Sequence, residues 1–96
     1  MRIFAVEYVY NPDHDDVRSE HRAAHREWLE GLVEQGLVLA SGPFTDGSGA
    51  LLIFASETEA DLNQLISKDP FARAGAISAV KTTGWNPVIG AFRDRA

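Results

Sequence analysis

The sequence predicts an α+β fold of the ferredoxin-like type (βαββαβ), in which an antiparallel sheet of four strands carries two helices on one face. Three observations predict this class. Strand-like and helix-like segments follow one another in the order strand, helix, strand, strand, helix, strand. A short connection containing glycine joins the two middle strands, and helical crossovers join the others. The 96 residues, 45% of them hydrophobic, suit one folded domain spanning residues 1–96.

The first strand is expected over residues 2–10, which are rich in β-branched and aromatic side chains. Alternation along a strand divides these side chains between two faces. One set comprises Phe4, Val6, Tyr8 and Tyr10, and the other comprises Ile3, Ala5, Glu7 and Val9. Both sets are largely apolar, so the strand is expected to be covered on both faces. Asn11 and Pro12 then end it with a turn.

The first helix is expected from Asp15 to Gln35, with acidic residues at its start and Gly36 just after its end. Intervals of three and four residues define its inner face as Val17, His21, His25, Trp28, Leu29 and Leu32. The opposite, charged face is expected in water and comprises Arg22, Arg26, Glu27, Glu30 and Glu34. Two histidines therefore interrupt a buried stripe. A titratable side chain in such a place needs a partner or a function.

The second half of the sequence supplies the remaining elements. Strands are expected over Leu37–Ala40, Ala50–Ala55 and Ile77–Trp85, with Gly42 and Pro43 ending the first of them. Ser56 to Glu59 forms a capping box that opens the second helix. Asp69 is expected as the N-cap of a further short helical turn, with Pro70 at its first position and Gly75 at its end.

Two helices can cover only one face of a four-stranded sheet. Because the first three strands are apolar on both faces, the uncovered face needs another apolar surface. We expect that face to include Phe4, Val6 and Tyr8, and we expect a second copy of the chain to cover it. The predicted assembly is a homodimer in which two sheets close into a dimeric α+β barrel.

Composition excludes several classes of partner. The net charge is −5, and the nine Lys and Arg residues are scattered, which argues against nucleic acid and against an anionic membrane surface. The chain has no cysteine, so neither disulfides nor thiolate metal sites are expected. The N-terminal segment does not resemble a signal peptide, and no apolar run approaches membrane length. We therefore expect a soluble, cytoplasmic protein.

The sequence predicts neither a metal site nor an organic cofactor. His21 and His25 have the i, i+4 spacing of a helical ligand pair, but HRAAH lacks the glutamate of a zincin motif. Only His14 is available as a third imidazole. Asp13, Asp15 and Asp16, at the start of the first helix, are typical of a helix start rather than of a cation site. The glycines at positions 47 and 49 lie between two strands, which is not the context of a phosphate-binding loop.

His25 and Asp69 are the residues for which the sequence leaves two interpretations open. Either His25 is a hydrogen-bonded core histidine and Asp69 is a helix cap, or the two form a pair that moves a proton. Both helices of the predicted fold lie on one sheet face, so these side chains can meet. Ser41, at a strand end, can point its hydroxyl into a pocket, but no nucleophile signature surrounds it.

Several short motifs, taken in order, resemble the YciI-like (YCII-related) family. They are H-x-x-W-L at residues 25–29, Ser41-Gly42-Pro43, Ser56, Asp69-Pro70-Phe71, Gly75 and Trp85. The resemblance covers nearly the whole chain. It implies a dimeric α+β barrel with a His–Asp active site, which maps onto His25 and Asp69, whereas His21 has no counterpart. Some members resemble dehydrochlorinases of hydroxylated chloroaromatics, and related folds include muconolactone isomerases.

The resulting functional expectation is a small enzyme that uses no metal or organic cofactor. It would bind a cyclic or aromatic small molecule and carry out an elimination or an isomerisation. His25 would transfer a proton, Asp69 would orient the imidazole, and Ser41, Gly42, Pro43 and Phe71 would bind the substrate. The alternative is a non-catalytic ligand-binding or regulatory module with the same pocket and dimer. The fold alone does not choose between them, but an accessible His–Asp pair favours the enzyme.

Overall fold

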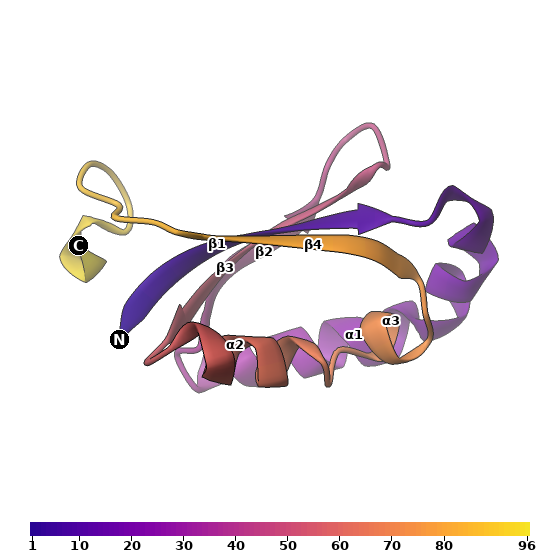
Figure 1. Ribbon diagram of the computed structural model, residues 1–96, viewed down its shortest axis with the longest axis horizontal. Helices are drawn as coiled ribbons and strands as arrows, with labels where there is room; N and C mark the ends of the chain where they lie inside the picture. Colours follow the sequence, from indigo (N-terminus) through magenta and orange to yellow (C-terminus); the bar gives the residue numbers. More distant parts are fainter.

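The computed structural model describes residues 1–96 and has the predicted α+β, ferredoxin-like architecture (Figure 1). Its strands and helices are β1 (Arg2–Tyr10), α1 (Asp15–Glu34), β2 (Val38–Pro43), β3 (Gly49–Ser56), α2 (Glu59–Ile66), α3 (Pro70–Arg73) and β4 (Ile77–Gly84). Two short 3-10 turns, η1 (Pro12–His14) and η2 (Arg93–Arg95), complete the chain. The sheet is antiparallel in the order β2-β3-β1-β4, so β2 and β4 are its edges. None of the helices combines the length and the apolar character needed to cross a membrane.

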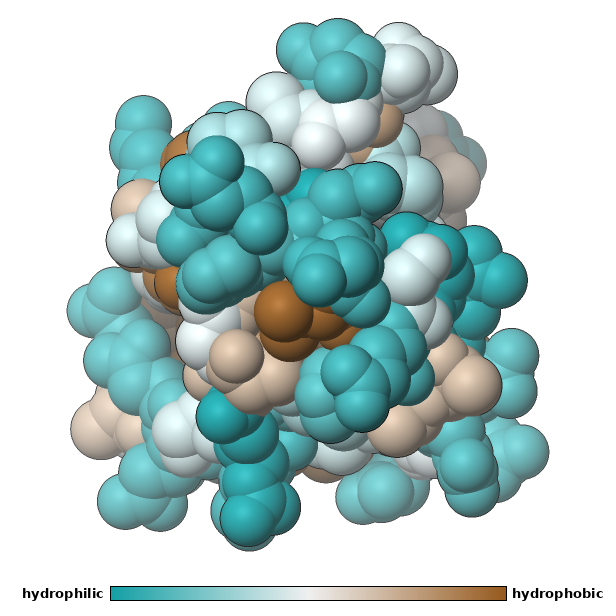
Figure 2. Space-filling view, turned by 90° about the vertical axis from the view of Figure 1, so that its right-hand side faces the viewer, coloured by the Kyte–Doolittle hydropathy of each residue, from teal (hydrophilic) through white to brown (hydrophobic).

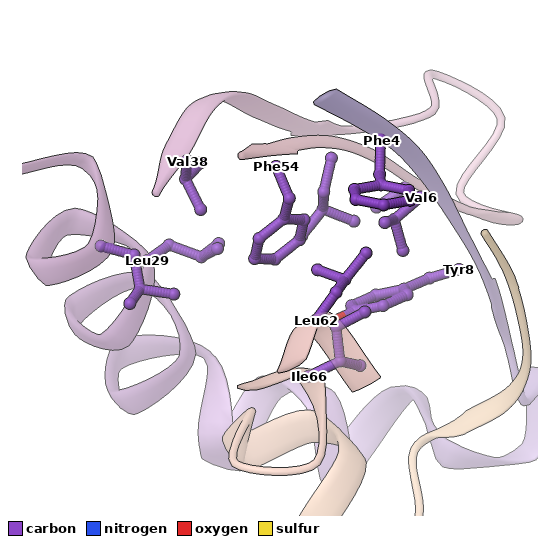
Figure 3. Close-up of a cluster of buried hydrophobic side chains, with 11 residues drawn as sticks. Phe4, Val6, Tyr8, Leu29, Val38, Phe54, Leu62 and Ile66 are labelled. Atoms are coloured by element: carbon purple, nitrogen blue, oxygen red, sulfur yellow. The ribbon is translucent and has the colours of Figure 1, made fainter. Parts of the chain in front are cut away.

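The hydrophobic core lies between the sheet and the helices, all three of which lie on one face (Figure 1). Phe4, Val6 and Tyr8 of β1 point from the central strand into this layer (Figure 3). They meet apolar side chains of β3, α1 and α2, namely Leu52, Phe54, Leu29, Leu32, Leu62 and Ile66. A fully buried side chain of this size contributes about 1.5–3 kcal/mol, so this cluster accounts for much of the stability of the fold.

The uncovered face of the sheet carries the other set of β1 side chains. Ile3 and Ala5 lie there with Ile53 and Ala55 of β3 in a smaller apolar cluster. The prediction that Phe4, Val6 and Tyr8 face outward is therefore wrong, because the helices cover that set. Alternation separates the two sets, but both are apolar, and the sequence of the strand contains nothing that selects the set under the helices.

The predicted boundaries hold for β1 and for the start of α1. The end of β2 and the N-cap of α2 differ from the prediction. Gly36, with φ of 75°, turns the chain after α1 as expected. The second strand, however, continues through Pro43, which pairs with Ala50 of β3. An edge strand tolerates proline because the missing N–H is not needed on its open side.

The cap of α2 also differs from the prediction. Thr58, not Ser56, is the N-cap, and its side chain accepts a hydrogen bond of 3.1 Å from the backbone N–H of Asp61. Ser56 is the last residue of β3, and its hydroxyl donates to the carbonyl of Thr58 at 2.9 Å. Because β3 extends through Ser56, the helix is capped two residues later than the predicted capping box places it.

Gly49, the first residue of β3, provides a test of the close approach between β3 and β1. A Cβ atom at this position would collide with the backbone carbonyl oxygen of Tyr8 on β1. We predict that Gly49→Ala lowers the free energy of unfolding by about 1–3 kcal/mol or more, since backbone cannot move aside cheaply. Gly84→Ala on β4 is the matched control, because its new Cβ would meet only the Arg2 side chain, at 4.0 Å. Urea unfolding of both variants measures the difference, and equal stability would contradict the prediction.

Candidate active site

The candidate site begins at Asp69, where the chain passes from α2 to α3. Asp69 is the N-cap of α3, and its Oδ1 accepts a hydrogen bond of 2.9 Å from the backbone N–H of Phe71. Pro70 occupies the first turn, where a missing N–H does no harm. The predicted cap is thus present, but it does not account for the whole environment of the side chain. Asp69 is 0% exposed, and a carboxylate so deeply buried needs further donors.

Two side chains supply those donors. Nδ1 of His25, from α1, lies 2.7 Å from Oδ1 of Asp69, and the Tyr8 hydroxyl, from β1, donates to Oδ2 at 2.8 Å. An aspartate carboxylate only accepts hydrogen bonds, so Nδ1 of His25 must carry the proton in this contact. Asp69 therefore joins three elements that are far apart in the sequence. It also fixes the tautomer of His25.

The His25 ring is held on its face as well as at its edge. It stacks on Phe71 with ring centroids 3.9 Å apart and an angle of 6° between the planes. Its Nε2 makes no hydrogen bond within the chain, yet no buried side-chain nitrogen or oxygen lacks a partner. It follows that Nε2 is accessible to solvent. The structure thus presents one free imidazole nitrogen, unprotonated when the ring is neutral, with little freedom to turn.

A pocket of about 380 Å³ adjoins His25 and Phe71. The residues predicted for substrate binding on β2, Ser41, Gly42 and Pro43, form its opposite wall. Ser41 pairs with Leu52 and therefore points to the same sheet face as the core, toward α1. The structure thus gathers His25, Phe71 and the three β2 residues around one cavity, with Asp69 behind His25. Its volume is in the range typical of small-molecule sites.

Arg18 and Tyr10 are pocket residues that the sequence did not single out. Arg18 is only 6% exposed, donates to the carbonyl of Asn11 at 2.8 Å, and lies over the Tyr10 ring at 4.5 Å. Asp15 pairs with its guanidinium at 3.5 Å. Arg18 precedes His25 by seven residues, which is two helical turns. This spacing puts both residues on one face of α1, and it is the sequence signal that could have identified Arg18 as a pocket residue.

Arg22 and Arg26 also line the pocket, although the sequence placed them on the outer face of α1. Both are exposed, so they lie at the outer part of the cavity. Long arginine side chains reach from the flank of a helix around its edge, which a division into two faces does not capture. Figure 2, which views the side where α1 begins, shows mostly hydrophilic side chains around a small hydrophobic patch.

The other two histidines lie outside this cavity. Nδ1 of His14 is 3.0 Å from the carbonyl of Gly75, a contact that ties η1 to the loop after α3. His21 borders a separate hollow with Lys68, Pro70 and Arg73. No group of three or more His, Asp or Glu side chains is arranged to hold a metal ion.

The electrostatics of the site appear most clearly at Tyr8. Burial, with the neighbouring Asp69 charge and the hydrogen bond to it, raises the pKa of the Tyr8 hydroxyl far above its usual range. Burial also raises the pKa of Tyr10, against the opposing effect of the Arg18 charge. Tyr8 thus keeps its proton, and its hydrogen bond to Asp69, above the usual tyrosine range.

Fold and site together define a small ferredoxin-like α+β protein with a buried His–Asp pair beside a polar pocket. The chain belongs to the YCII-related family, since the sequence model of the YCII-related domain matches residues 1–86. The resemblance drawn from the motifs is therefore confirmed. No curated protein matches the sequence.

Solved structures with this fold include an enzyme that is moderately similar in sequence. The chain is 26% identical to 5-chloro-2-hydroxyhydroquinone dehydrochlorinase (TftG) from Burkholderia phenoliruptrix AC1100, solved in complex with 2,5-dihydroxybenzoquinone. The match covers 86% of this chain and 92% of that one, with a TM-score of 0.77. Two further neighbours share the fold alone. One is an antibiotic biosynthesis monooxygenase with 17% identity, in which the match covers 88% of this chain and 96% of that one with a TM-score of 0.54. The other is Rv0793 from Mycobacterium tuberculosis with 14% identity, in which the match covers 93% of this chain and 96% of that one with a TM-score of 0.55.

The Tyr8–Asp69 contact predicts a loss of stability in alkali. The pKa of Tyr8 is raised in the fold, so its contribution is complete below the usual tyrosine value of 10.0 and disappears as the pH rises above it. We expect the free energy of unfolding to fall above about pH 10, and to fall less steeply in Tyr8→Phe. At neutral pH that variant should lose about 1–2 kcal/mol, because Oδ2 of Asp69 loses its donor. Denaturant unfolding from about pH 8 to pH 11 checks both, and identical slopes would contradict the assignment.

Proposed function

We propose that the protein is a small-molecule enzyme in which His25 transfers a proton and Asp69 orients the imidazole. The observation that carries the proposal is the 2.7 Å contact between Nδ1 of His25 and Asp69, which leaves Nε2 accessible beside the pocket. A general base must have its free nitrogen within reach of the substrate and its other nitrogen held. If Asp69 were only a helix cap and His25 only a core histidine, Nε2 would not need to be accessible from a pocket.

The proposed reaction is an elimination on a hydroxylated ring. Nε2 accepts the proton of a ring hydroxyl, and the ring electrons shift toward the carbon that bears the leaving group. His25 returns its proton to that carbon. The leaving group departs as an anion with its bonding electrons, while a second hydroxyl gives its proton to solvent. The net loss is one proton and one anion, so the step needs no electron carrier.

Two features of the pocket support a single-ring substrate. Its volume of about 380 Å³ suits one substituted ring, and Phe71 and Tyr10 give it an aromatic wall. Ser41 supplies a hydroxyl opposite His25 that would hold a ring oxygen, beside Gly42 and Pro43. The similarity to a dehydrochlorinase of 5-chloro-2-hydroxyhydroquinone points to the same substrate class, a chlorinated hydroxyaromatic ring.

The test is chloride release from 5-chloro-2-hydroxyhydroquinone under anaerobic conditions. His25→Gln should lower the turnover about 10²- to 10⁴-fold, the contribution typical of a general acid–base residue. Asp69→Asn should lower it comparably if the two act as a unit. His14→Gln is the matched control, because the His14 side chain bonds only to the Gly75 carbonyl, outside the pocket. A His25→Gln protein that keeps wild-type turnover would refute the proposal, and ring binding without turnover in the wild type would favour the non-catalytic binding module.

We also propose that the chain forms a homodimer through the uncovered sheet face, with two sheets facing one another. Val9 and Leu51 lie on that face and are 50% and 40% exposed, beside the cluster of Ile3, Ile53 and Ala55. An apolar face of this kind is expected to be covered. A two-fold pairing would bring each residue opposite the same surface of the other copy.

Sedimentation should accordingly give twice the chain mass at micromolar concentration. Leu51→Lys places a charge in the proposed interface and should shift the protein toward the monomer. Val33→Lys is the control, because Val33 is also exposed and apolar but belongs to α1 on the other side of the sheet. A wild-type monomer, or equal masses for the two variants, would refute this interface.

A further inference from the structure

We infer that the substrate enters the pocket as an anion, and that Arg22 and Arg26 bind its charged group at the outer part of the cavity. This inference rests on the proposed function and specifies the charge of the substrate. Its basis is an imbalance of charge around the pocket. Three arginines line the cavity, against a single carboxylate, Asp15. The lining residues of β2 and its hairpin, Ser41, Gly42, Pro43 and Gly47, carry no charge.

The three arginines form one stripe along α1. Arg18, Arg22 and Arg26 are spaced by four residues, so each lies one turn from the next. Like charges at this spacing repel one another and destabilise a helix by a small amount. The helix nevertheless holds both like-charge pairs on its pocket side. A bound anion would relieve this repulsion.

Arg22 and Arg26 differ from Arg18 in having no carboxylate partner. The ion pairs of the chain are Arg18 with Asp15 and His25 with Asp69. The contact that Arg22 does make is a long one, 3.4 Å, to the Ser19 hydroxyl. Its helical neighbours three and four residues away are Arg18, Ser19, His25 and Arg26, none of which is negative. Arg26 has Glu30 four residues further on but forms no ion pair with it. Both guanidinium groups therefore remain available to a ligand.

This local charge contrasts with the chain as a whole. The protein carries a net charge of −5, and four glutamates of α1 lie outside the pocket lining. Asp69, the other carboxylate nearby, already accepts hydrogen bonds at both oxygens behind His25. A cationic rim on an acidic protein concentrates anions at one place, because the arginines lie together on one edge of a cavity.

The arrangement defines the chemical class of the ligand. Guanidinium groups bind carboxylates and ring-bound oxygen anions through paired hydrogen bonds. His25 Nε2, deeper in the pocket, needs a hydroxyl proton to accept. A ring that carries both an ionised oxygen and a further hydroxyl, such as a hydroxylated benzoate, meets both requirements. A neutral ring of the same size meets only the second.

The experiment compares two rings of similar shape, one anionic and one neutral. The probes are 2,5-dihydroxybenzoquinone, whose two acidic hydroxyls are ionised at neutral pH, and 2,5-dimethoxybenzoquinone, which is neutral. Titrations of the full chain follow the His25 ring signals by NMR, so that binding is read in the pocket itself. We expect the ionised probe to shift these signals and to bind at least about tenfold more tightly than the neutral one.

The variants assign the effect to the two arginines. Arg22→Gln and Arg26→Gln should each weaken the ionised probe about tenfold and leave the neutral one unchanged. Arg93→Gln is the matched control, because η2 lies at the opposite end of the molecule (Figure 1). Arg22→Gln should not unfold more easily than the wild type, since it removes both like-charge pairs of the stripe. Added salt should weaken the ionised probe alone.

The outcomes separate this inference from the proposed function. Equal affinities for the two probes, with no effect of either pocket variant, would overturn the inference and leave the role of His25 intact. Weakening of equal size in Arg93→Gln would also overturn it, because a general effect of net charge would then explain the binding. If neither probe shifts the His25 signals, both the inference and the pocket on which the proposed function rests lose their support.

Discussion

The buried carboxylate of Asp69 is the interaction on which the rest of the site depends. Taking a carboxylate out of water costs several kcal/mol unless donors replace the water, and here three donors do so. They come from β1, α1 and α3 as the Tyr8 hydroxyl, the His25 ring and the Phe71 backbone. One charge therefore ties the centre of the sheet to the long helix and to the start of the short one.

The same contact decides which part of His25 is available for chemistry. Asp69 uses Nδ1, and Phe71 covers one face of the ring, so that Nε2 is the remaining polar atom and lies beside the cavity. Because Asp69 bonds the ring at its edge and Phe71 stacks on its face, its orientation is set before any ligand binds. Such preorganisation lowers the cost of reaching a reactive geometry.

Charge in this protein has to be considered by position rather than by total. A net charge of −5 describes the protein as a whole. Around the pocket, three arginines at intervals of one helical turn produce a positive local field. Total charge governs long-range behaviour in solution, whereas binding depends on the groups within a few ångströms of the ligand.

The sequence by itself determined the order of the elements, the buried position of His25 and the capping role of Asp69, because periodicity and caps are local properties. It did not determine which face of β1 the helices cover. The side chains of one face, Phe4, Val6 and Tyr8, and those of the other, Ile3, Ala5 and Val9, are both apolar. It also could not give the Tyr8–Asp69 bond, whose partners lie 61 residues apart. Arg22 and Arg26 belong to the pocket only because β2 supplies its opposite wall. Contacts between distant segments depend on how the elements pack, and only the tertiary structure decides that.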